Sequence, residues 1–307
     1  MSEFGPGREF DLIRKFEQRL GGAIDGIGHD CAILPVRDAS IAVSSDLSIE
    51  GTHFRFGWLE PHEVGWRATA AALSDLAAAG ARPAAVLVSL GFDPEWPDER
   101  AVELMDGCGA AAGSVGARIV GGDVVKAQRC TIGVTVLGTL DGPAVNRSGA
   151  SIGDRVWVTG SLGGPAQALL AWQNGAEPDA AARTRFAHPI PRIEMGLTLR
   201  GVASAMIDLS DGLASDAGHL AAASGVGLTI DYDAVPLHPS VTDRDLAFTG
   251  GEEYELLFTV PHTADVPADV VESEVGATHI GEVVEGSRVV VLRGDEVVDV
   301  GRGYRHL

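Results

Sequence analysis

Residues 206–216 read Met206-Ile-Asp-Leu-Ser-Asp-Gly-Leu-Ala-Ser-Asp216. The apolar start predicts a short strand, and from Leu213 onward apolar residues recur three or four positions apart, as on one face of a helix. Asp208, Ser210 and Asp211 therefore lie where a strand gives way to a helix. Backbone N–H groups are unpaired at such a junction, and oxygen ligands can converge there. The stretch indicates a place to bind phosphates and hard cations.

Other aspartates stand in similar settings, each at the end of an apolar segment or in a turn. Taken singly, an Asp beside Ser or Gly usually caps a helix or a turn. Taken together, they favour a metal site, because two like charges ~4 Å apart repel by about 4 kcal/mol at an effective dielectric of 20. Magnesium suits such a site, since it takes oxygen ligands and bridges phosphates. The candidate ligands, which we expect to meet in one magnesium-loaded site, are Asp30, Ser44, Ser45, Asp46, Asp75, Asp123, Asp208 and Asp211.

The composition bounds the class of protein. A chain of 307 residues has room for two domains, and with 45% hydrophobic and 21% charged residues it can bury real cores. The formal net charge of −20 opposes binding to nucleic acids or anionic membranes, so neither is an expected partner. The same charge implies that a phosphate substrate arrives together with metal ions.

Several common chemistries have no matching motif. The chain has only two lysines, Lys15 and Lys126, neither of which stands in a G-x-x-x-x-G-K-[ST] phosphate loop, and no H-x-x-x-H pair suggests zinc. Three cysteines without metal-type spacing, no signal peptide and no apolar run near ~20 residues favour a reduced, cytoplasmic protein.

The order of predicted elements indicates two α+β or mixed α/β domains. A polar, turn-rich segment over 142–153 separates them, which predicts an N-terminal domain over 1–143 and a C-terminal domain over 144–307. The patterns predict helices over 8–20, 63–80, 97–115, 164–174 and 190–202, strands over 84–92, 117–120, 131–140, 154–159, 228–231 and 256–260, a closing hairpin over 278–300 around Glu285-Gly286, and a further turn at Gly294-Asp295.

Three further residues stay open on sequence grounds alone. His53 could contact a substrate or be a satisfied structural histidine. Arg147, in a glycine-serine loop, is either a phosphate clamp or a surface charge, and the surface is the commoner case. Tyr304 would by default be an ordinary packing aromatic.

Eight motifs, in order along nearly the whole chain, resemble those of thiamine-monophosphate kinases within the aminoimidazole-ribonucleotide-synthetase-like superfamily of ATP-using enzymes. Each motif alone would be weak, but eight in sequence make a strong signal. They are Gly26-Ile-Gly-His-Asp-Cys-Ala, Ser44-Ser-Asp46 with Gly51-Thr-His53-Phe, Leu73-Ser-Asp75-Leu-Ala-Ala-Ala-Gly80, Val120-Gly-Gly-Asp123, Asn146-Arg147-Ser-Gly, Ile207-Asp-Leu-Ser-Asp-Gly212, Gly250-Gly-Glu-Glu-Tyr-Glu255 and Gly303-Tyr304.

The resemblance implies ATP-dependent phosphorylation of thiamine monophosphate to thiamine diphosphate, with several Mg²⁺ ions. It also implies a two-domain fold of the superfamily type. The N-terminal domain would bind ATP and metal and pair into a homodimer through its sheets, and the C-terminal domain would complete the cleft. All eight candidate ligands match metal positions, with Asp46, Asp123 and Asp211 the expected catalytic residues. Gly122, Arg147 and Ser210 match ATP contacts, and His53, Glu252 and Tyr304 match substrate contacts.

Two residues depart from the family pattern. The glycine turn usually carries two successive aspartates, and here the first is His29. The usual Gly-Gly-Glu-Asp-Tyr-Glu has Glu253 in the Asp place, which lengthens that acid by one methylene. The first change removes a negative charge near the expected metals.

Because donor and acceptor are both phosphates, the resemblance favours direct in-line transfer. The acceptor phosphate is already ionised and needs no general base, which fits a site rich in acids. Two alternatives remain. One is a sister enzyme of the superfamily, although no cysteine precedes Cys31 and the chain ends Arg305-His306-Leu307, without the cysteines such relatives would use. The other is a non-catalytic acidic metal-binding protein.

Overall fold

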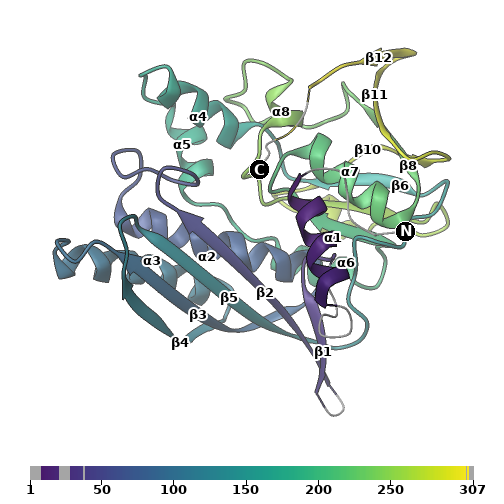
Figure 1. Cartoon of the computed structure of the whole chain (residues 1–307). Helices are drawn as coiled ribbons and strands as arrows, with labels where there is room; N and C mark the ends of the chain where they lie inside the picture. Colours follow the sequence, from purple (N-terminus) through teal and green to yellow (C-terminus); the bar gives the residue numbers. More distant parts are fainter. Residues whose placement is uncertain (1–7, 21–27, 37–38, 302, 304–307) are drawn as a thin grey trace.

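The structure, a computed structural model, describes residues 8–20, 28–36, 39–301 and 303. These residues form two mixed α/β units, each built on its own sheet (Figure 1). The predicted fold class is therefore confirmed. In the described residues no helix combines the length and apolar character needed to span a bilayer.

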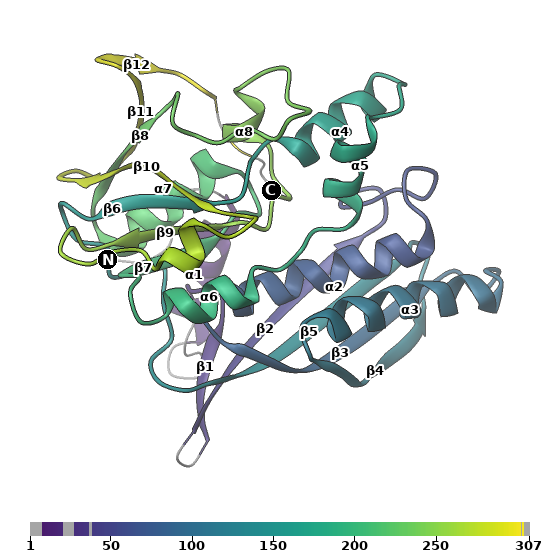
Figure 2. The same cartoon turned by 180° about the vertical axis from the view of Figure 1, so that it is seen from behind.

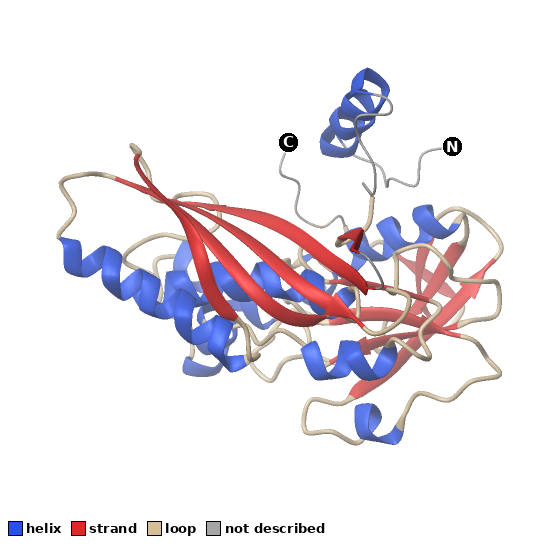
Figure 3. Ribbon diagram, turned by 90° about the horizontal axis from the view of Figure 1, so that it is seen from below, coloured by secondary structure: helices blue, strands red, loops and turns tan. Residues whose placement is uncertain are grey.

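The first sheet has five strands in the order β1-β2-β5-β3-β4. Helices α2 and α3 cover one face, as the view from behind shows (Figure 2). The described helices leave the opposite face uncovered, and α1 stands apart from the sheet (Figure 3). The elements of this unit are α1 (Arg8–Leu20), β1 (Ala32–Val36), β2 (Ala39–Ile49), α2 (Pro61–Ala78), β3 (Arg82–Phe92), α3 (Asp98–Ser114), β4 (Arg118–Lys126) and β5 (Thr131–Leu140).

Helix α2 is the central element of this unit, and most of its residues are buried. Two glycines let it lie against α3 at backbone contact. A Cβ on Gly65 would lie 1.9 Å from the carbonyl oxygen of Leu104, and one on Gly107 would lie 1.9 Å from that of His62. Of the glycines in α3, Gly107 is thus needed for packing.

The second sheet has seven strands in the order β12-β11-β8-β10-β6-β9-β7. Its core includes the apolar side chains of β7 and α7. The elements of this unit are β6 (Arg155–Thr159), α4 (Gly164–Gln173), α5 (Ala180–Ala187), α6 (Ile193–Leu199), β7 (Ala205–Asp208), α7 (Leu213–Ser224), β8 (Gly227–Asp231), α8 (Leu246–Thr249), β9 (Leu256–Val260), α9 (Ala268–Val271), β10 (Ala277–Val284), β11 (Val289–Arg293) and β12 (Glu296–Val298).

The predicted hairpin around Glu285-Gly286 is wrong. Strands β10 and β11 both pair with β8, which lies between them, and β11 runs parallel to β8. Gly281 permits the close approach of β8, because a Cβ there would lie 1.9 Å from the carbonyl oxygen of Thr229. The turn at Gly294-Asp295 does join a hairpin, that of β11 and β12.

The strand predicted over 117–120 continues to Lys126 as β4. The other predicted elements lie within a few residues of those observed, with two differences in the segment after β6. The helix predicted over 190–202 is shorter, α6, and α5 was not predicted. The boundary between residues 143 and 144 stays a prediction.

The two units share a continuous core. Side chains of α4, α5 and α6 pack in the same apolar cluster as those of α2 and the first sheet. Trp58 stacks on Trp172 with ring centroids 5.2 Å apart, and Arg183 on α5 pairs with Glu63 on α2 at 2.7 Å. These contacts fix the segment between β6 and β7 to the first unit.

Candidate active site

Three aspartates from distant parts of the chain meet at the junction of the two units. Asp30 precedes β1, Asp75 lies in the last turn of α2, and Asp208 is the last residue of β7. Each offers a carboxylate oxygen, and these three atoms lie within 4.8 Å of one another. The predicted convergence is thus observed for these three residues, which we call the acid cluster.

The acid cluster is electrostatically unfavourable by itself. Burial raises the pKa of Asp75 well above its usual range, and the charges of Asp46, Asp208 and Asp30 raise it further. Burial and the charge of Asp30 raise the pKa of Asp208 in the same way. A cation bound between the carboxylates would relieve this repulsion.

Arg147 supplies one positive charge to the cluster. Its Nη2 lies 2.8 Å from Oδ1 of Asp30, and its Nε donates to both carboxylate oxygens at 3.2 Å. Burial opposes the charge on the guanidinium group, but Asp30 holds the pKa of Arg147 above its ordinary value. Arg147 is therefore not a surface charge.

Strand β2 delivers Ser44 and Asp46 to the acid cluster and directs Ser45 away from it. The hydroxyl of Ser44 donates to Oδ2 of Asp75. Successive side chains of a strand point to opposite faces, so Asp46 shares the inner face with Ser44. The hydroxyl of Ser45 lies on the outer face, 3.0 Å from that of Thr135.

Asp123 is not brought to the acid cluster within one chain. It pairs in register with Ser89, Gly133 and Leu47 across the sheet, whereas Asp46 pairs with Val134. Asp123 thus lies on the outer face, on edge strand β4, three strand spacings or about 14 Å from β2.

Gly122, next to it, has φ +153°, and a Cβ there would lie 1.7 Å from the carbonyl oxygen of Val88. Only glycine fits this position. The expectation that all six aspartates meet at one point is wrong for Asp123 in the single chain.

The loop after β7 and the helix α7 that follows it hold a second group of metal-type side chains. Oxygen and nitrogen atoms of Asp211, Asp216 and His219 lie within 4.8 Å of one another. Asp216 accepts the backbone N–H groups of Asp211 and Gly212 at 3.0 and 3.1 Å. Burial lowers the pKa of His219 to about 4.

The segment 250–255 lies against this loop. The backbone N–H of Glu252 donates to the carbonyl of Ser210, and that of Tyr254 donates to Leu209, both at 2.8 Å. Gly251 allows the contact, because a Cβ there would lie 2.4 Å from the carbonyl oxygen of Ser210. Glu252 is therefore adjacent to the predicted ATP contact Ser210, which is exposed.

Two predicted substrate contacts differ in how far the structure describes them. His53 is half-buried in the turn after β2, and its Nδ1 accepts the backbone N–H of Ile49 at 3.0 Å. Tyr304 lies outside the described residues. Its neighbour Gly303 comes so close to the loop that a Cβ would lie 2.4 Å from the carbonyl oxygen of Asp211.

Oxygen donors dominate the site, which suits Mg²⁺. Asp30, Asp75 and Asp208, with Ser44 and Asp46 beside them, fit such an ion, because their carboxylates are close together and largely buried. Asp211 would extend the set on the loop side.

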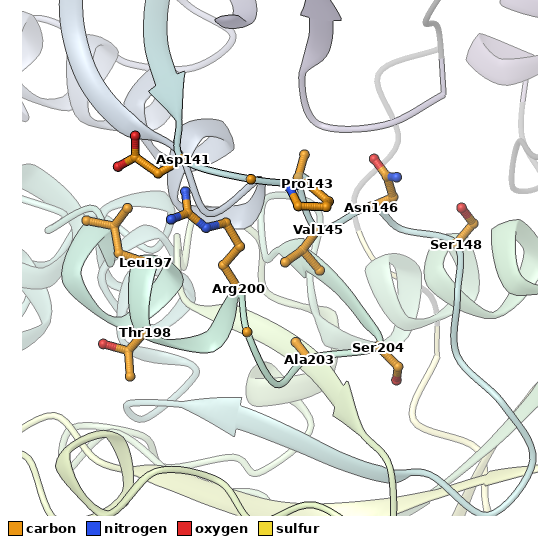
Figure 4. Close-up of a pocket in the computed structure, with 13 residues that line it drawn as sticks. Asp141, Pro143, Val145, Asn146, Ser148, Leu197, Thr198, Arg200, Ala203 and Ser204 are labelled. Carbon is orange, nitrogen blue, oxygen red and sulfur yellow. The ribbon is translucent and has the colours of Figure 1, made fainter. Parts of the chain in front are cut away.

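A cavity of about 660 Å³ lies elsewhere, around the segment between the units (Figure 4). Asn146 and Ser148 line it and flank Arg147, but none of the site aspartates does. The cavity is therefore not part of the acid cluster.

Comparisons with known proteins show the family to which the chain belongs. The sequence matches "AIR synthase related protein, N-terminal domain" over residues 28–140 and the corresponding C-terminal domain over 151–293. The thiamine-monophosphate kinase of Mycobacterium tuberculosis is 38% identical over 96% of this chain and 90% of its own. That of Salmonella typhimurium is 37% identical over 97% and 98%.

The chain belongs to the thiamine-monophosphate kinase family.

A solved structure of the same family supports the assignment. AaThiL complexed with AMPPCP and TMP has a TM-score of 0.87 and 30% identity to this chain, over 97% of each.

Glu253 is one of the two expected departures from the family pattern, and the structure shows its surroundings. Glu253 is fully buried, and its Oε1 accepts the backbone N–H of Gly163 at the start of α4. Burial raises its pKa to about 8. His29, the other departure, is half-buried beside Asp30.

Sequence reasoning missed some residues around the family's motifs. Asp216 and His219 lie three residues apart in the helical pattern after Asp211, a signal that was available. Arg67, Arg185 and Arg192 hold the glutamates of segment 250–255 from elsewhere in the chain, and no local pattern marks them. Arg192 Nε, for example, donates to Oε2 of Glu255 at 2.7 Å.

Proposed function

We propose that this chain transfers the γ-phosphoryl group of ATP to thiamine monophosphate, giving ADP and thiamine diphosphate. Family membership makes it a kinase. The observation that carries the proposal is the meeting of Asp30, Asp75, Asp208 and Arg147, all from family motifs, at the junction of the two units. A relative of the same fold has been solved with an ATP analogue and thiamine monophosphate.

We propose Mg²⁺ as the cofactor, bound by the acid cluster with Ser44, Asp46 and Asp211. When bound, Mg²⁺ would neutralise phosphate charge and align donor and acceptor. Arg147 would contact ATP while holding Asp30, and Ser210 and Gly122 would present backbone or hydroxyl groups to the nucleotide. The ion pair of Arg147 with Asp30, and the position of Ser210 two residues after Asp208, support these roles.

The transfer would be direct. A phosphate acceptor is ionised at neutral pH and needs no general base. Asp46 and Asp211, as metal ligands, would lose that role if they accepted phosphate.

We propose that the chain forms a homodimer through its first sheet. The outer face and the β4 edge expose apolar side chains, among them Leu47, Val120 and Val124 at 54%, 63% and 68%. Exposed apolar patches and sheet edges are typical interfaces. Pairing there would also explain why Asp123 lies exposed and apart from Asp46. Light scattering that reports a monomer at working concentration would contradict the dimer.

We also propose a cytoplasmic location. The three cysteines are all free and buried, which suits a reducing compartment.

A coupled assay tests the activity. ADP release with ATP and Mg²⁺ should depend on thiamine monophosphate and should fall to background in Asp208→Asn. ADP release that ignores the acceptor would instead favour another ATP-using relative of the superfamily. Metal binding without nucleotide binding would favour a non-catalytic protein.

A further inference from the structure

Glu252 has an unusual backbone that fixes where its carboxylate points. Its φ is +69°, and that of Tyr254 is +52°, in the left-handed region that non-glycine residues rarely occupy. Such conformations persist where the surroundings determine them, and they gather at functional sites. Here the hydrogen bonds from segment 250–255 to the loop after β7 hold both residues.

A buried arginine from the other unit holds the same carboxylate. Nη2 of Arg67, on α2, lies 2.6 Å from Oε2 of Glu252, and the Arg67 side chain is only 4% exposed. The two groups form an ion pair, but the geometry at Nη2 of Arg67 is not that of a hydrogen bond. The Tyr254 hydroxyl donates to the same Oε2.

Arg67 is itself fixed from a third side. Its Nη1 donates to the backbone carbonyl of Phe186, and its Cζ lies 3.7 Å from the centroid of the Phe186 ring. The guanidinium group therefore cannot rotate away from Glu252 without losing both contacts. On the same helix, Asp75 follows eight residues later, about 12 Å along the axis.

Arg67 and Tyr254 both contact Oε2 of Glu252, so Oε1 is available to a ligand. In the described part of the chain, no hydrogen bond reaches Oε1 of Glu252, and the side chain keeps 22% of its exposure. An anchored and partly exposed carboxylate suits a cationic or N–H-bearing ring.

We propose that Arg67 is a positioning residue that presents Oε1 of Glu252 to the nitrogen-containing ring system of the phosphate acceptor, and thereby sets acceptor affinity without contacting ATP. The inference rests on the proposed kinase activity for the identity of the acceptor. It assigns a specificity role to a residue of α2 that acts only through Glu252.

The test compares Arg67→Met with Arg67→Lys, Glu252→Gln and the double variant Arg67→Met/Glu252→Gln. KM for thiamine monophosphate should rise by roughly tenfold in Arg67→Met, which corresponds to about 1.4 kcal/mol, with KM for ATP within about twofold of wild type. Arg67→Lys keeps the charge and should recover part of the loss. In the Glu252→Gln background, Arg67→Met should add little.

Arg183→Met is the matched control, because it breaks another ion pair between α2 and the segment after β6, that of Arg183 with Glu63. It should leave both KM values unchanged. Calorimetric titration with thiamine monophosphate alone supplies a readout independent of turnover, and thermal unfolding of each variant reports stability.

Equal rises of both KM values, or full additivity in the double variant, would reduce Arg67 to a structural role and overturn the proposal. If Arg67→Met does not fold, an unchanged acceptor affinity in Arg67→Lys and Glu252→Gln would overturn it equally. Wild-type protein that turns over no thiamine monophosphate would instead contradict the proposed function.

Discussion

The guanidinium group of Arg147 and the carboxylate of Asp30 form a forked ion pair, with Nη2 2.8 Å from Oδ1. The Asp30 side chain is 3% exposed and that of Arg147 is 19% exposed. Arg147 belongs to the segment between the two units, and Asp30 to the acid cluster. This ion pair thus links the proposed nucleotide-binding group, Arg147, to the proposed metal ligands. Replacing either residue should therefore affect both ATP binding and metal binding.

Replacing Arg147 should destabilise the protein as well as weaken ATP binding. Arg147→Met would leave Asp30 buried beside Asp75 and Asp208 without its counter-charge, a change that typically costs about 3–5 kcal/mol. Arg147→Lys keeps the charge but loses the fork, so its loss should be smaller. Urea unfolding of the two variants measures the difference. An Arg147→Met protein as stable as wild type would mean that the pair contributes nothing.

ATP should stabilise the fold strongly only when magnesium is present. The net charge of −20 and the clustered carboxyl groups of Asp30, Asp75 and Asp208 oppose a bare polyphosphate. Ligand at 100 times its dissociation constant adds roughly 2.7 kcal/mol. Thermal unfolding with ATP, with magnesium and with both together checks this. The same shift for ATP in EDTA would remove the case for magnesium.

Asp46→Asn and Asp123→Asn should each lower kcat by orders of magnitude and leave the fold intact. A loss of three decades corresponds to about 4 kcal/mol of transition-state stabilisation. Asp141→Asn, at another exposed position, is the control and should keep full turnover. If Asp123→Asn is fully active, Asp123 is only a residue of the exposed sheet face.

Glu253 predicts a pH effect on stability. Burial raises its pKa to about 8 from an ordinary 4.5, so its folded form holds a proton that the unfolded chain releases. The stability that it contributes is complete below pH 4.5 and is lost as the pH rises toward 8. The free energy of unfolding of wild type should therefore fall relative to that of Glu253→Gln over this window, by a few kcal/mol. Parallel pH profiles for the two proteins would contradict the prediction.

Local sequence patterns predicted site residues that lie on a single helix or strand. They did not predict features that depend on the pairing of strands. Asp208 could be predicted because it follows the apolar residues Met206 and Ile207. Asp75 could be predicted because the residues around it partly repeat that stretch. The opposite faces of Asp46 and Asp123 follow from strand register, which the sequence does not show. The false hairpin arose in the same way, because β8 inserts between β10 and β11.

Interactions between the two units could not be predicted from the sequence either. Arg67 is an arginine in an Ala-rich helix, and nothing near it in the sequence points to Glu252. Only the docking of α5 and segment 250–255 on α2 reveals its role. Tyr304 stays a prediction, because it lies outside the described residues.

The most direct test of direct phosphoryl transfer follows the label of γ-labelled ATP. With magnesium and thiamine monophosphate, label should appear in thiamine diphosphate in step with ADP. Without the acceptor, denaturing separation and mass spectrometry should find no labelled protein. Stoichiometric label held covalently by the protein and released by thiamine monophosphate, or ADP formed without labelled thiamine diphosphate, would contradict the account.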